Sequence, residues 1–192
     1  MKILDLPILL ASKSPRRSQL LREAGFNIRI DSIEIDEVYP DDLDKENVAE
    51  YLAKLKAEAS LSLKKENEVL IASDTIVYMD GVIYGKPKSR EEAVDVLKQL
   101  SGKEHRVITG VAIHYKNKTI SFSDSSSVWL DHLSAEEIDY YVDNFNPYDK
   151  AGAYAIQEWI GHCKIVKIEG TYNNIMGLPV QKLYTHLKEL SI

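Results

Sequence analysis

The chain has 192 residues, of which 44% are apolar and 28% are charged, and its formal net charge is −6. This length is enough for a domain with a buried core, and the acidic balance argues against a general nucleic-acid-binding protein, which needs a basic surface. The single cysteine excludes an internal disulfide and favours a reducing compartment, so we expect a cytoplasmic protein.

The first residues do not predict a targeting or membrane segment. Asp5 and Pro7 interrupt the apolar residues there, and no small-residue cleavage site follows them. No apolar run elsewhere approaches the ~20 residues that a membrane-spanning helix needs. We therefore expect a first strand in place of a signal peptide, and no membrane partner.

Residues 8–12, ILLAS, form a short apolar run that predicts a buried strand. Ser14 then suits the N-cap of a helix, and Pro15 suits its first position. The helical pattern continues until Gly25, which is typical of a residue just beyond a helix end.

Arg16 and Arg17 fall in the first turn of this helix, where the helix dipole disfavours cations. A bound polyanion would offset this cost, because free backbone N–H groups, guanidinium groups and serine hydroxyls converge there. In the alternative interpretation, both arginines are solvated or paired with acidic residues downstream. The pattern alone leaves both interpretations open.

Residues 31–50 are strongly acidic and predict a largely solvated loop followed by a helix start, with Asp36 and Glu37 as candidate metal ligands. Residues 45–63 predict a helix, because their apolar side chains recur at helical spacing. Lys56 lies at the edge of the apolar stripe and could point along the body of the protein. A snorkelling surface lysine is the interpretation that the pattern favours.

Residues 68–84 predict a strand and then a hairpin whose turn is Asp80-Gly81. Asp74 follows an apolar run within this segment. A carboxylate there is costly unless it is paired or lies at an open strand end, where ligand sites of α/β sheets gather. A capping or turn aspartate explains the position equally well.

Lys86 follows this hairpin between a glycine and a proline. The constrained backbone suits a positioned cation, although lysines are common in turns. Capping boxes at Ser89 and Ser134 predict two further helix starts. Residues 149–161 are mostly small, with Gln157 as the lone amide, and would let the backbone approach another group closely.

The remaining segments continue an alternation of strands and helices. Residues 104–130 predict two strands, residues 163–168 predict another, and a proline opens the last helix. Cys163 is expected to be a buried apolar residue of its strand. We therefore predict an α/β fold with a mixed sheet, in a single domain over residues 1–192.

Several familiar sites are absent from the sequence. It contains no GxxxxGK[ST] loop, no GxGxxG fingerprint and no GxSxG nucleophile elbow. The five histidines show no metal-ligand spacing.

A set of short segments, taken in chain order, resembles the Maf family of nucleoside triphosphate pyrophosphatases. The segments are SKSPRR, IDE, LKAEA, ASDTIVYMDG, GKP, LSGKEHRVITGV, DKAGAYAIQ and NNIMGLP. The ordered set covers nearly the whole chain and is specific, although no single segment is. The resemblance implies an α/β fold with an elongated mixed sheet flanked by helices and a cleft between two lobes, related to the inosine-triphosphate pyrophosphatases.

This resemblance implies an enzyme that hydrolyses a nucleoside triphosphate to the monophosphate and pyrophosphate. The implied cofactor is a divalent metal cation, Mg²⁺ or Mn²⁺. Ser12, Arg16 and Arg17 match the family's residues that hold the triphosphate, and Lys56 and Lys86 would flank the same anion.

Asp74 matches the family's general base, which would activate a metal-bound water for attack on the α-phosphorus. Glu37 and Asp74 would lie at the metal. Thr75 and Gln157, together with Arg16, match the branch that acts on dTTP and UTP, with modified pyrimidine triphosphates as further candidates. Another branch, with glutamine at the position of Thr75, prefers 7-methyl-GTP.

The resemblance also implies a homodimer, because family members are often dimeric. Two other functions stay open. The first is an enzyme of the inosine-triphosphate class that acts on deaminated purine nucleotides. The second is a nucleotide-binding regulator of cell division or septum formation without relevant turnover.

Overall fold

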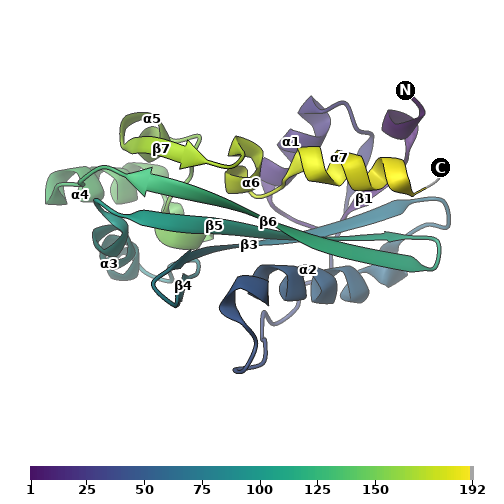
Figure 1. Ribbon diagram of the computed structural model, residues 1–192, viewed down its shortest axis with the longest axis horizontal. Helices are drawn as coiled ribbons and strands as arrows, with labels where there is room; N and C mark the ends of the chain where they lie inside the picture. The colour runs from purple at the N-terminus through teal and green to yellow at the C-terminus, as the bar shows by residue number, and fades with distance from the viewer. Residues whose placement is uncertain (191–192) are drawn as a thin grey trace. The chain divides into compact units, whose positions relative to one another are not determined.

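The structure is a computed structural model that describes residues 1–190. Among these residues, seven strands pair in the order β2-β1-β3-β5-β6-β7, with β4 paired to β3 (Figure 1). The strands are β1 (Ile8–Leu10), β2 (Ile28–Ile30), β3 (Val69–Met79), β4 (Val82–Tyr84), β5 (Glu104–Tyr115), β6 (Lys118–Leu130) and β7 (Ile165–Glu169). The sheet is mixed, because β1 pairs in parallel with β2 and β3 whereas β7 is antiparallel to β6. The predicted α/β fold with a mixed sheet is confirmed.

Helices alternate with the strands along the chain. The α-helices are α1 (Pro15–Glu23), α2 (Val48–Ala59), α3 (Arg90–Leu100), α4 (Ala135–Phe145), α5 (Trp159–Cys163), α6 (Tyr172–Met176) and α7 (Val180–Glu189). Short 3₁₀ helices cover Lys2–Asp5, Lys45–Asn47, Leu61–Leu63, Pro147–Asp149 and Ala151–Ala153. Within residues 1–190, none of the helices has the length and apolar character that crossing a membrane requires.

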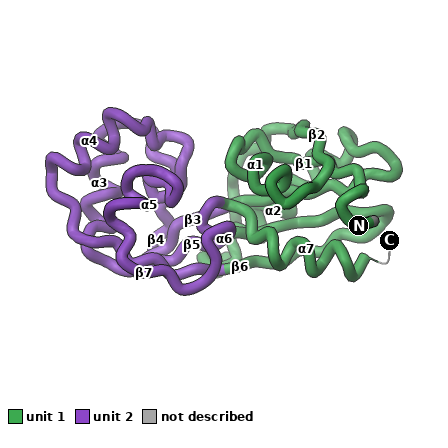
Figure 2. The backbone as a smooth tube through the Cα atoms, turned by 90° about the horizontal axis from the view of Figure 1, so that it is seen from above, with its two compact units in different colours: residues 1–74, 109–124, 177–192 green, residues 75–108, 125–176 purple. Residues whose placement is uncertain are grey.

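The chain divides into two compact units (Figure 2). Unit 1 comprises residues 1–74, 109–124 and the described residues from 177 onward, and unit 2 comprises residues 75–108 and 125–176. Strands β3, β5 and β6 each contribute residues to both units. The single domain over residues 1–192 and the cleft between two lobes stay predictions.

Unit 1 is built around the buried strand β1. All three of its residues are buried, and it pairs with β2 on one side and with β3 on the other. A parallel strand covered on both faces needs a continuous apolar run, which ILL supplies. Helix α2 packs Ala53 and Ala57 against Leu9 of β1 and Leu70 of β3.

Helix α2 lies very close to strand β5. A Cβ atom added at Gly110 would lie 2.3 Å from backbone atoms of Ala49 in the helix. Such an approach requires glycine on the strand, and the small side chain of Ala49 is itself fully buried. This close packing fixes how far the later residues of α2, including Lys56, lie from the sheet.

Helix α1 begins and ends at the predicted positions, although the side chain of Ser14, at the N-cap position, makes no capping hydrogen bond among the described residues. Pro15 is its first residue. Beyond its last residue, the N–H of Gly25 donates to the carbonyl of Arg22 at 2.9 Å, and the N–H of Phe26 donates to the carbonyl of Leu21 at 3.0 Å. With a φ of +84° at Gly25, these bonds form a Schellman motif.

The helix predicted over residues 45–63 is shorter in the structure. Helix α2 covers only Val48–Ala59, between two 3₁₀ helices. Its C-cap residue is Ser60, whose N–H group is shared between the carbonyls of Lys56, at 3.2 Å, and Ala57, at 3.1 Å. This shared bond tightens the last turn, which the apolar spacing in the sequence does not reveal.

The turn and cap predictions for unit 2 are largely confirmed. Asp80 and Gly81 have φ angles of 51° and 81°, as the type I′ turn of a two-residue hairpin requires. Ser134 forms a complete capping box at the start of α4. At the start of α3 only half of the capping box forms: the Ser89 hydroxyl accepts from the N–H of Glu92. The Glu92 carboxylate accepts from the N–H of Lys88 and not from that of Ser89.

The prediction for Cys163 is wrong. Cys163 is exposed and is the last residue of α5, and strand β7 begins only at Ile165. The chain forms a short helix after Glu158, so the residues before the strand complete this helix. Because β7 lies at the end of the strand order, its side chains are also more exposed than those of a central strand, and Val166 is 66% exposed.

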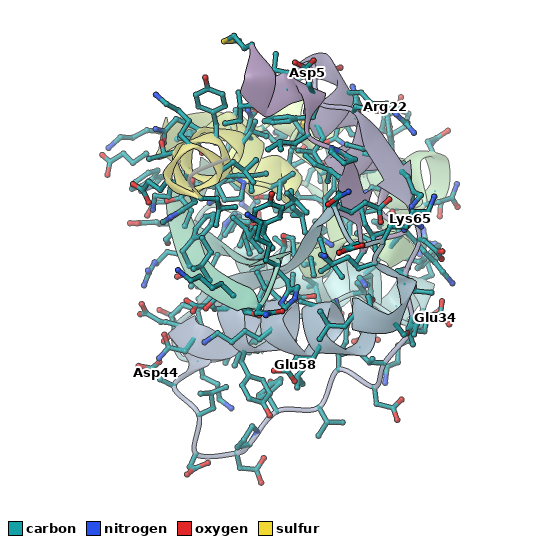
Figure 3. The ribbon with its side chains drawn as sticks, turned by 90° about the vertical axis from the view of Figure 1, so that its right-hand side faces the viewer. Asp5, Arg22, Glu34, Asp44, Glu58 and Lys65 are labelled. Atoms are coloured by element: carbon teal, nitrogen blue, oxygen red, sulfur yellow. The ribbon has the colours of Figure 1, made fainter. Side chains whose placement is uncertain are left out.

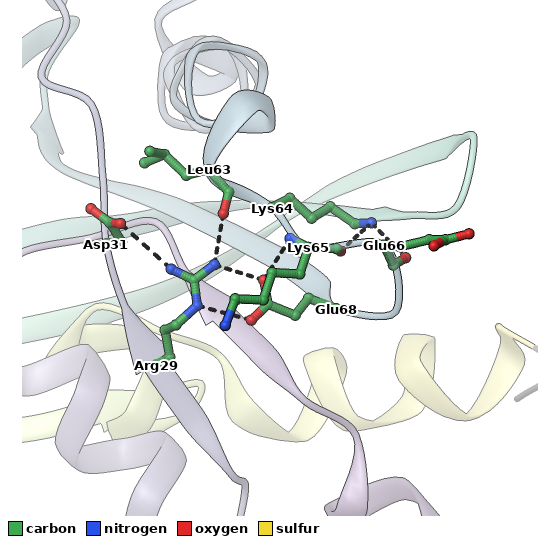
Figure 4. A network of polar contacts seen from close by, with 7 residues as sticks. All are labelled: Arg29, Asp31, Leu63, Lys64, Lys65, Glu66 and Glu68. Atoms are coloured by element: carbon green, nitrogen blue, oxygen red, sulfur yellow. Dashed lines mark hydrogen bonds and ion pairs between the residues drawn. The ribbon is translucent and has the colours of Figure 1, made fainter.

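An arginine–glutamate pair joins β2 to the segment before β3 within unit 1 (Figure 4). Arg29 donates from Nε to Glu68 Oε1 at 2.9 Å and from Nη2 to Glu68 Oε2 at 2.7 Å. Nη2 also donates to the carbonyl of Leu63 at 2.7 Å, and the N–H of Lys65 donates to Glu68 at 2.8 Å. The hydrogen bonds from Arg29 lower the pKa of Glu68 to about 2, against a usual value of 4.5.

Replacing Glu68 by glutamine should make unit 1 less stable in a pH-dependent way. The folded pKa of Glu68 lies below its unfolded value, so its contribution is present above pH 4.5 and is lost as the pH falls toward 2. At neutral pH we expect Glu68→Gln to lower the free energy of unfolding by about 1–3 kcal/mol. The difference from the parent protein should shrink below pH 4.5.

Urea unfolding followed by circular dichroism at several pH values measures this difference. Glu66→Gln is the matched control, because Glu66 is an exposed neighbour in the same segment. A destabilisation by Glu68→Gln that stayed constant from pH 7 to pH 3 would contradict the assigned role of the ionised carboxylate.

Candidate functional site

The ammonium group of Lys56 holds two carboxylates together in unit 1. Lys56 Nζ lies 2.5 Å from Asp74 Oδ1 and 2.6 Å from Glu37 Oε1. Lys56 comes from α2, Asp74 from β3, and Glu37 from the extended segment after β2. The three side chains therefore meet although they lie far apart in the sequence.

Burial distinguishes the two carboxylates. The side chain of Asp74 is 8% exposed, whereas that of Glu37 is 42% exposed. Removing the partner of a buried charge typically costs about 3–5 kcal/mol, so Asp74 depends on Lys56 more strongly than Glu37 does. Asp74 lies inside β3 and not at its end, so the interpretation as a turn or capping aspartate is wrong.

The interpretation of Lys56 as a snorkelling surface lysine is also wrong. Its side chain is only 17% exposed and points to Asp74 and Glu37. The apolar pattern places Lys56 at the edge of the buried stripe correctly. It does not show that a carboxylate on β3 lies opposite.

Arg17 is fixed by hydrogen bonds from two separate parts of unit 1. Its Nε donates to the carbonyl of Gly177 at 2.8 Å, and its Nη1 donates to Ser12 Oγ at 3.1 Å. The Ser73 hydroxyl donates to the same Gly177 carbonyl at 3.2 Å. The guanidinium group is therefore held between Ser12, which follows β1, and the Gly177 carbonyl in the loop before α7.

Electrostatics links Arg17 to the carboxylates. Burial lowers the pKa of Arg17, and the carboxylates of Asp74 and Glu37 oppose this decrease, whereas Arg16 adds to it. An arginine remains protonated near neutral pH, so Arg17 is a partly buried cation close to acidic groups. Unit 1 thus brings together Ser12, Arg17, Lys56, Asp74 and Glu37, with Arg16 close enough to act on Arg17.

The other predicted site residues belong to unit 2. Thr75 directly follows Asp74 in β3, and Lys86 is exposed in the segment between β4 and α3. Gln157 lies in a turn before α5. Its amide Oε1 atom is buried and accepts no hydrogen bond from the part of the chain that the structure describes. A buried acceptor without a donor is costly, so this atom is suited to a ligand.

Glu37 and Asp74 suit a hard divalent cation. Carboxylate oxygens are the ligands that Mg²⁺ prefers, and Mg²⁺ is often held by one or two carboxylates with water and phosphate oxygens completing its shell. No group of three or more histidine, cysteine, aspartate or glutamate side chains that could hold a metal occurs among residues 1–190. The carboxylates of Glu37 and Asp74 can each supply an oxygen ligand to such a cation.

Two groups near Arg17 were not predicted from the sequence: the Gly177 carbonyl that accepts from Arg17, and the Ser73 hydroxyl that donates to the same carbonyl. The Gly177 carbonyl belongs to NNIMGLP, and the Ser73 hydroxyl belongs to ASDTIVYMDG, so both lie in segments that carry the family resemblance. No side-chain pattern indicates that a backbone carbonyl will accept from an arginine. Only the folded chain shows it.

The sequence model of the family described as "Maf-like protein" matches residues 7–190. The chain belongs to the Maf family. A protein of Porphyromonas gingivalis named "dTTP/UTP pyrophosphatase" is 50% identical over 187 residues, covering 95% of this chain and 93% of that protein. A Bacteroides thetaiotaomicron protein of the same name is 48% identical over 184 residues, covering 95% of each chain.

Among solved structures, the Ham1 protein of Staphylococcus aureus is similar with a TM-score of 0.47 and 17% sequence identity. The similarity covers 65% of this chain and 71% of that one.

Replacing Arg17 by lysine should destabilise unit 1. A single ammonium group cannot reproduce the planar fork that reaches Ser12 and Gly177 together, so at least one of the two hydrogen bonds from residue 17 is lost. We expect the free energy of unfolding to fall by about 1–3 kcal/mol, measured by urea unfolding.

Arg22→Lys is the matched control, because Arg22 is exposed on the same helix (Figure 3). It should leave stability within about 0.5 kcal/mol of the parent protein. Equal effects of the two substitutions would mean that Arg17 is not specifically held.

Proposed function

We propose that this protein hydrolyses dTTP and UTP to the nucleoside monophosphate and pyrophosphate. The observation that carries the proposal is the buried Asp74 carboxylate, held at 2.5 Å by Lys56 and lying close to the cation of Arg17. This arrangement combines a proton acceptor with cations that attract polyphosphate. The names of relatives about half identical to this chain support dTTP and UTP as substrates.

The cations would hold the triphosphate. Arginine forks match phosphate oxygens in pairs, and lysine ammonium groups add point charges. In this proposal Arg16, Arg17 and Ser12 contact the phosphates, and Lys56 and Lys86 flank them. Because Arg17 is fixed before substrate arrives, it would lose little freedom on binding.

Asp74 would act as the general base. Its carboxylate takes a proton from the attacking water, the water oxygen bonds to the α-phosphorus, and the bond from the α-phosphorus to the bridging oxygen breaks. Pyrophosphate carries away the electron pair of that bond. A divalent metal, Mg²⁺ or Mn²⁺, would be held by Glu37 and Asp74 and would supply neutralisation of the phosphate charge when bound.

Gln157 would select the base together with Thr75 and Arg16. Uracil and thymine present an N3–H donor beside carbonyl acceptors. The buried Oε1 of Gln157 lacks a donor among the described residues, and the amide NH₂ beside it can donate, so the side chain complements that edge. We further propose that the protein is a homodimer in the cytoplasm and acts without a nucleic-acid or membrane partner.

Pyrophosphate release across a panel of nucleotides tests the activity and the base together. With Mg²⁺ present, we expect turnover led by dTTP and UTP over CTP, GTP, ATP, ITP and 7-methyl-GTP. Asp74→Asn should reduce kcat by about 10²–10⁴-fold, which is the usual contribution of a general base. Asp80→Asn is the control, because Asp80 is exposed in the hairpin turn of the same segment and asparagine tolerates its positive φ.

Other outcomes of the panel lead to different conclusions. Turnover led by ITP or 7-methyl-GTP would keep the chemistry and overturn the assigned base preference. Binding of dTTP without any turnover would favour the regulator of cell division. Wild-type turnover in Asp74→Asn would remove Asp74 from the role of base.

Metal removal tests the carboxylate pair. Treatment with a chelator should abolish turnover, and Mg²⁺ or Mn²⁺ should restore it. Glu37→Gln should raise the Mg²⁺ concentration needed for half-maximal rate several-fold, because a neutral amide oxygen replaces a charged ligand. Glu34→Gln is the control, since Glu34 is an exposed acid in the same segment (Figure 3). An unchanged Mg²⁺ requirement in Glu37→Gln would place the metal elsewhere.

A further inference from the structure

Gln157 occupies the third position of a tight turn in unit 2. The turn runs from Ala155 to Glu158, and it is closed by a hydrogen bond from the N–H of Glu158 to the carbonyl of Ala155 at 3.1 Å. Ile156 and Gln157 are its two central residues. The direction of the Gln157 side chain therefore depends on how firmly this turn is held.

A single buried hydroxyl holds both ends of the turn. Tyr141 belongs to α4 and is fully buried. Its OH accepts a hydrogen bond from the N–H of Ala155 at 3.0 Å and donates a short one to Oε2 of Glu158. Burial, followed by the Glu158 carboxylate, raises the pKa of Tyr141, so the hydroxyl keeps the proton that it donates.

Lys150 holds the second oxygen of the same carboxylate. Its side chain is 7% exposed, and Nζ lies 3.3 Å from Glu158 Oε1. Nζ also donates to the carbonyls of Phe145 and Asn146, at 3.2 Å each, and lies 3.0 Å from Asp149 Oδ1. Glu158 is therefore bonded at both oxygens, and α4 is connected through Lys150 and Tyr141 to the turn.

Neighbouring backbone restricts the centre of the turn. A Cβ atom added at Gly161 would lie 1.7 Å from the carbonyl oxygen of Ile156, so helix α5 packs directly against that peptide. On the preceding side, the Tyr154 hydroxyl lies 2.7 Å from Nε2 of the buried His105. The hydroxyl of Tyr154, the carbonyl of Ile156 and the carboxylate of Glu158 thus each have a close contact, whereas the amide Oε1 of Gln157 has no hydrogen-bond partner within residues 1–190.

We propose that Tyr141 is a positioning residue for base selection, which acts by holding the Ala155–Glu158 turn and thereby the amide of Gln157. This inference rests on the proposed function. A glutamine amide that rotates by half a turn exchanges its donor and acceptor, and it then complements cytosine as well as uracil or thymine. Discrimination against CTP therefore requires an amide held in one orientation against the base edge, and the turn fixes the backbone from which the Gln157 side chain reaches that edge.

Tyr141→Phe removes only the hydroxyl and retains the ring in the core. We expect the ratio of kcat/KM for dTTP to that for CTP to fall roughly tenfold, which corresponds to one lost hydrogen bond. The change should appear in the KM for dTTP, with kcat little altered, because the phosphate-binding groups are untouched. Tyr140→Phe is the matched control, since Tyr140 is the preceding residue of the same helix and is 48% exposed.

A pair of substitutions at Glu158 separates positioning from general stability. Glu158→Gln retains an oxygen that accepts from the Tyr141 hydroxyl, so it should keep most of the preference for dTTP. Glu158→Ala removes that acceptor and should lower the preference as Tyr141→Phe does. If Tyr141→Phe does not fold, as judged by circular dichroism, the comparison of Glu158→Gln with Glu158→Ala tests the inference on its own.

An unchanged preference in folded Tyr141→Phe, or equal preferences in the two Glu158 variants, would overturn this inference while leaving the proposed function intact. A parent protein that turns over neither dTTP nor UTP would overturn the proposed function, and this inference with it.

Discussion

Asp74 lies in the interior of a strand, where a carboxylate is stable only when a positive partner reaches it, and Lys56 is that partner at 2.5 Å. The lysine reaches Asp74 because α2 lies close to the sheet. The absence of a side chain at Gly110 permits this approach, and the alanines on the buried face of α2 keep it close. The ion pair in unit 1 therefore depends on steric packing, because the apolar contacts set the distance between Lys56 and Asp74.

Arg17 shows how the same unit tolerates cations at the start of a helix. The helix dipole disfavours two arginines in the first turn of α1, and burial adds a desolvation cost for Arg17. Hydrogen bonds to Ser12 and Gly177, and the nearby carboxylates of Asp74 and Glu37, offset these costs. A triphosphate would add the negative charge that this arrangement still favours, since α1 has no acidic residue in its first turn.

The sequence predicts those features that depend on neighbours along the chain. The buried strand β1, the start and end of α1 and the Asp80-Gly81 turn follow from local apolar patterns and backbone preferences, and the structure confirms them. The contact between Lys56 and Asp74 joins distant segments, which the local pattern does not reveal. That pattern favoured a surface lysine at position 56 and allowed a turn or capping aspartate at position 74. The resemblance to the Maf family named the candidate site residues, but it did not show that the Gly177 carbonyl accepts from both Arg17 and Ser73.

The proposed function places different physical demands on the site residues of the two units. In unit 1, attraction between cations and a polyphosphate acts over several ångströms and tolerates small displacements. In unit 2, reading a base edge requires hydrogen bonds, which weaken steeply with misalignment. In the proposed function, this difference accounts for the dense network of bonded groups around Gln157. Tyr141, Lys150 and Glu158 use buried polar atoms, which are expensive unless every one is paired, to hold a turn that apolar contacts alone would leave free to shift.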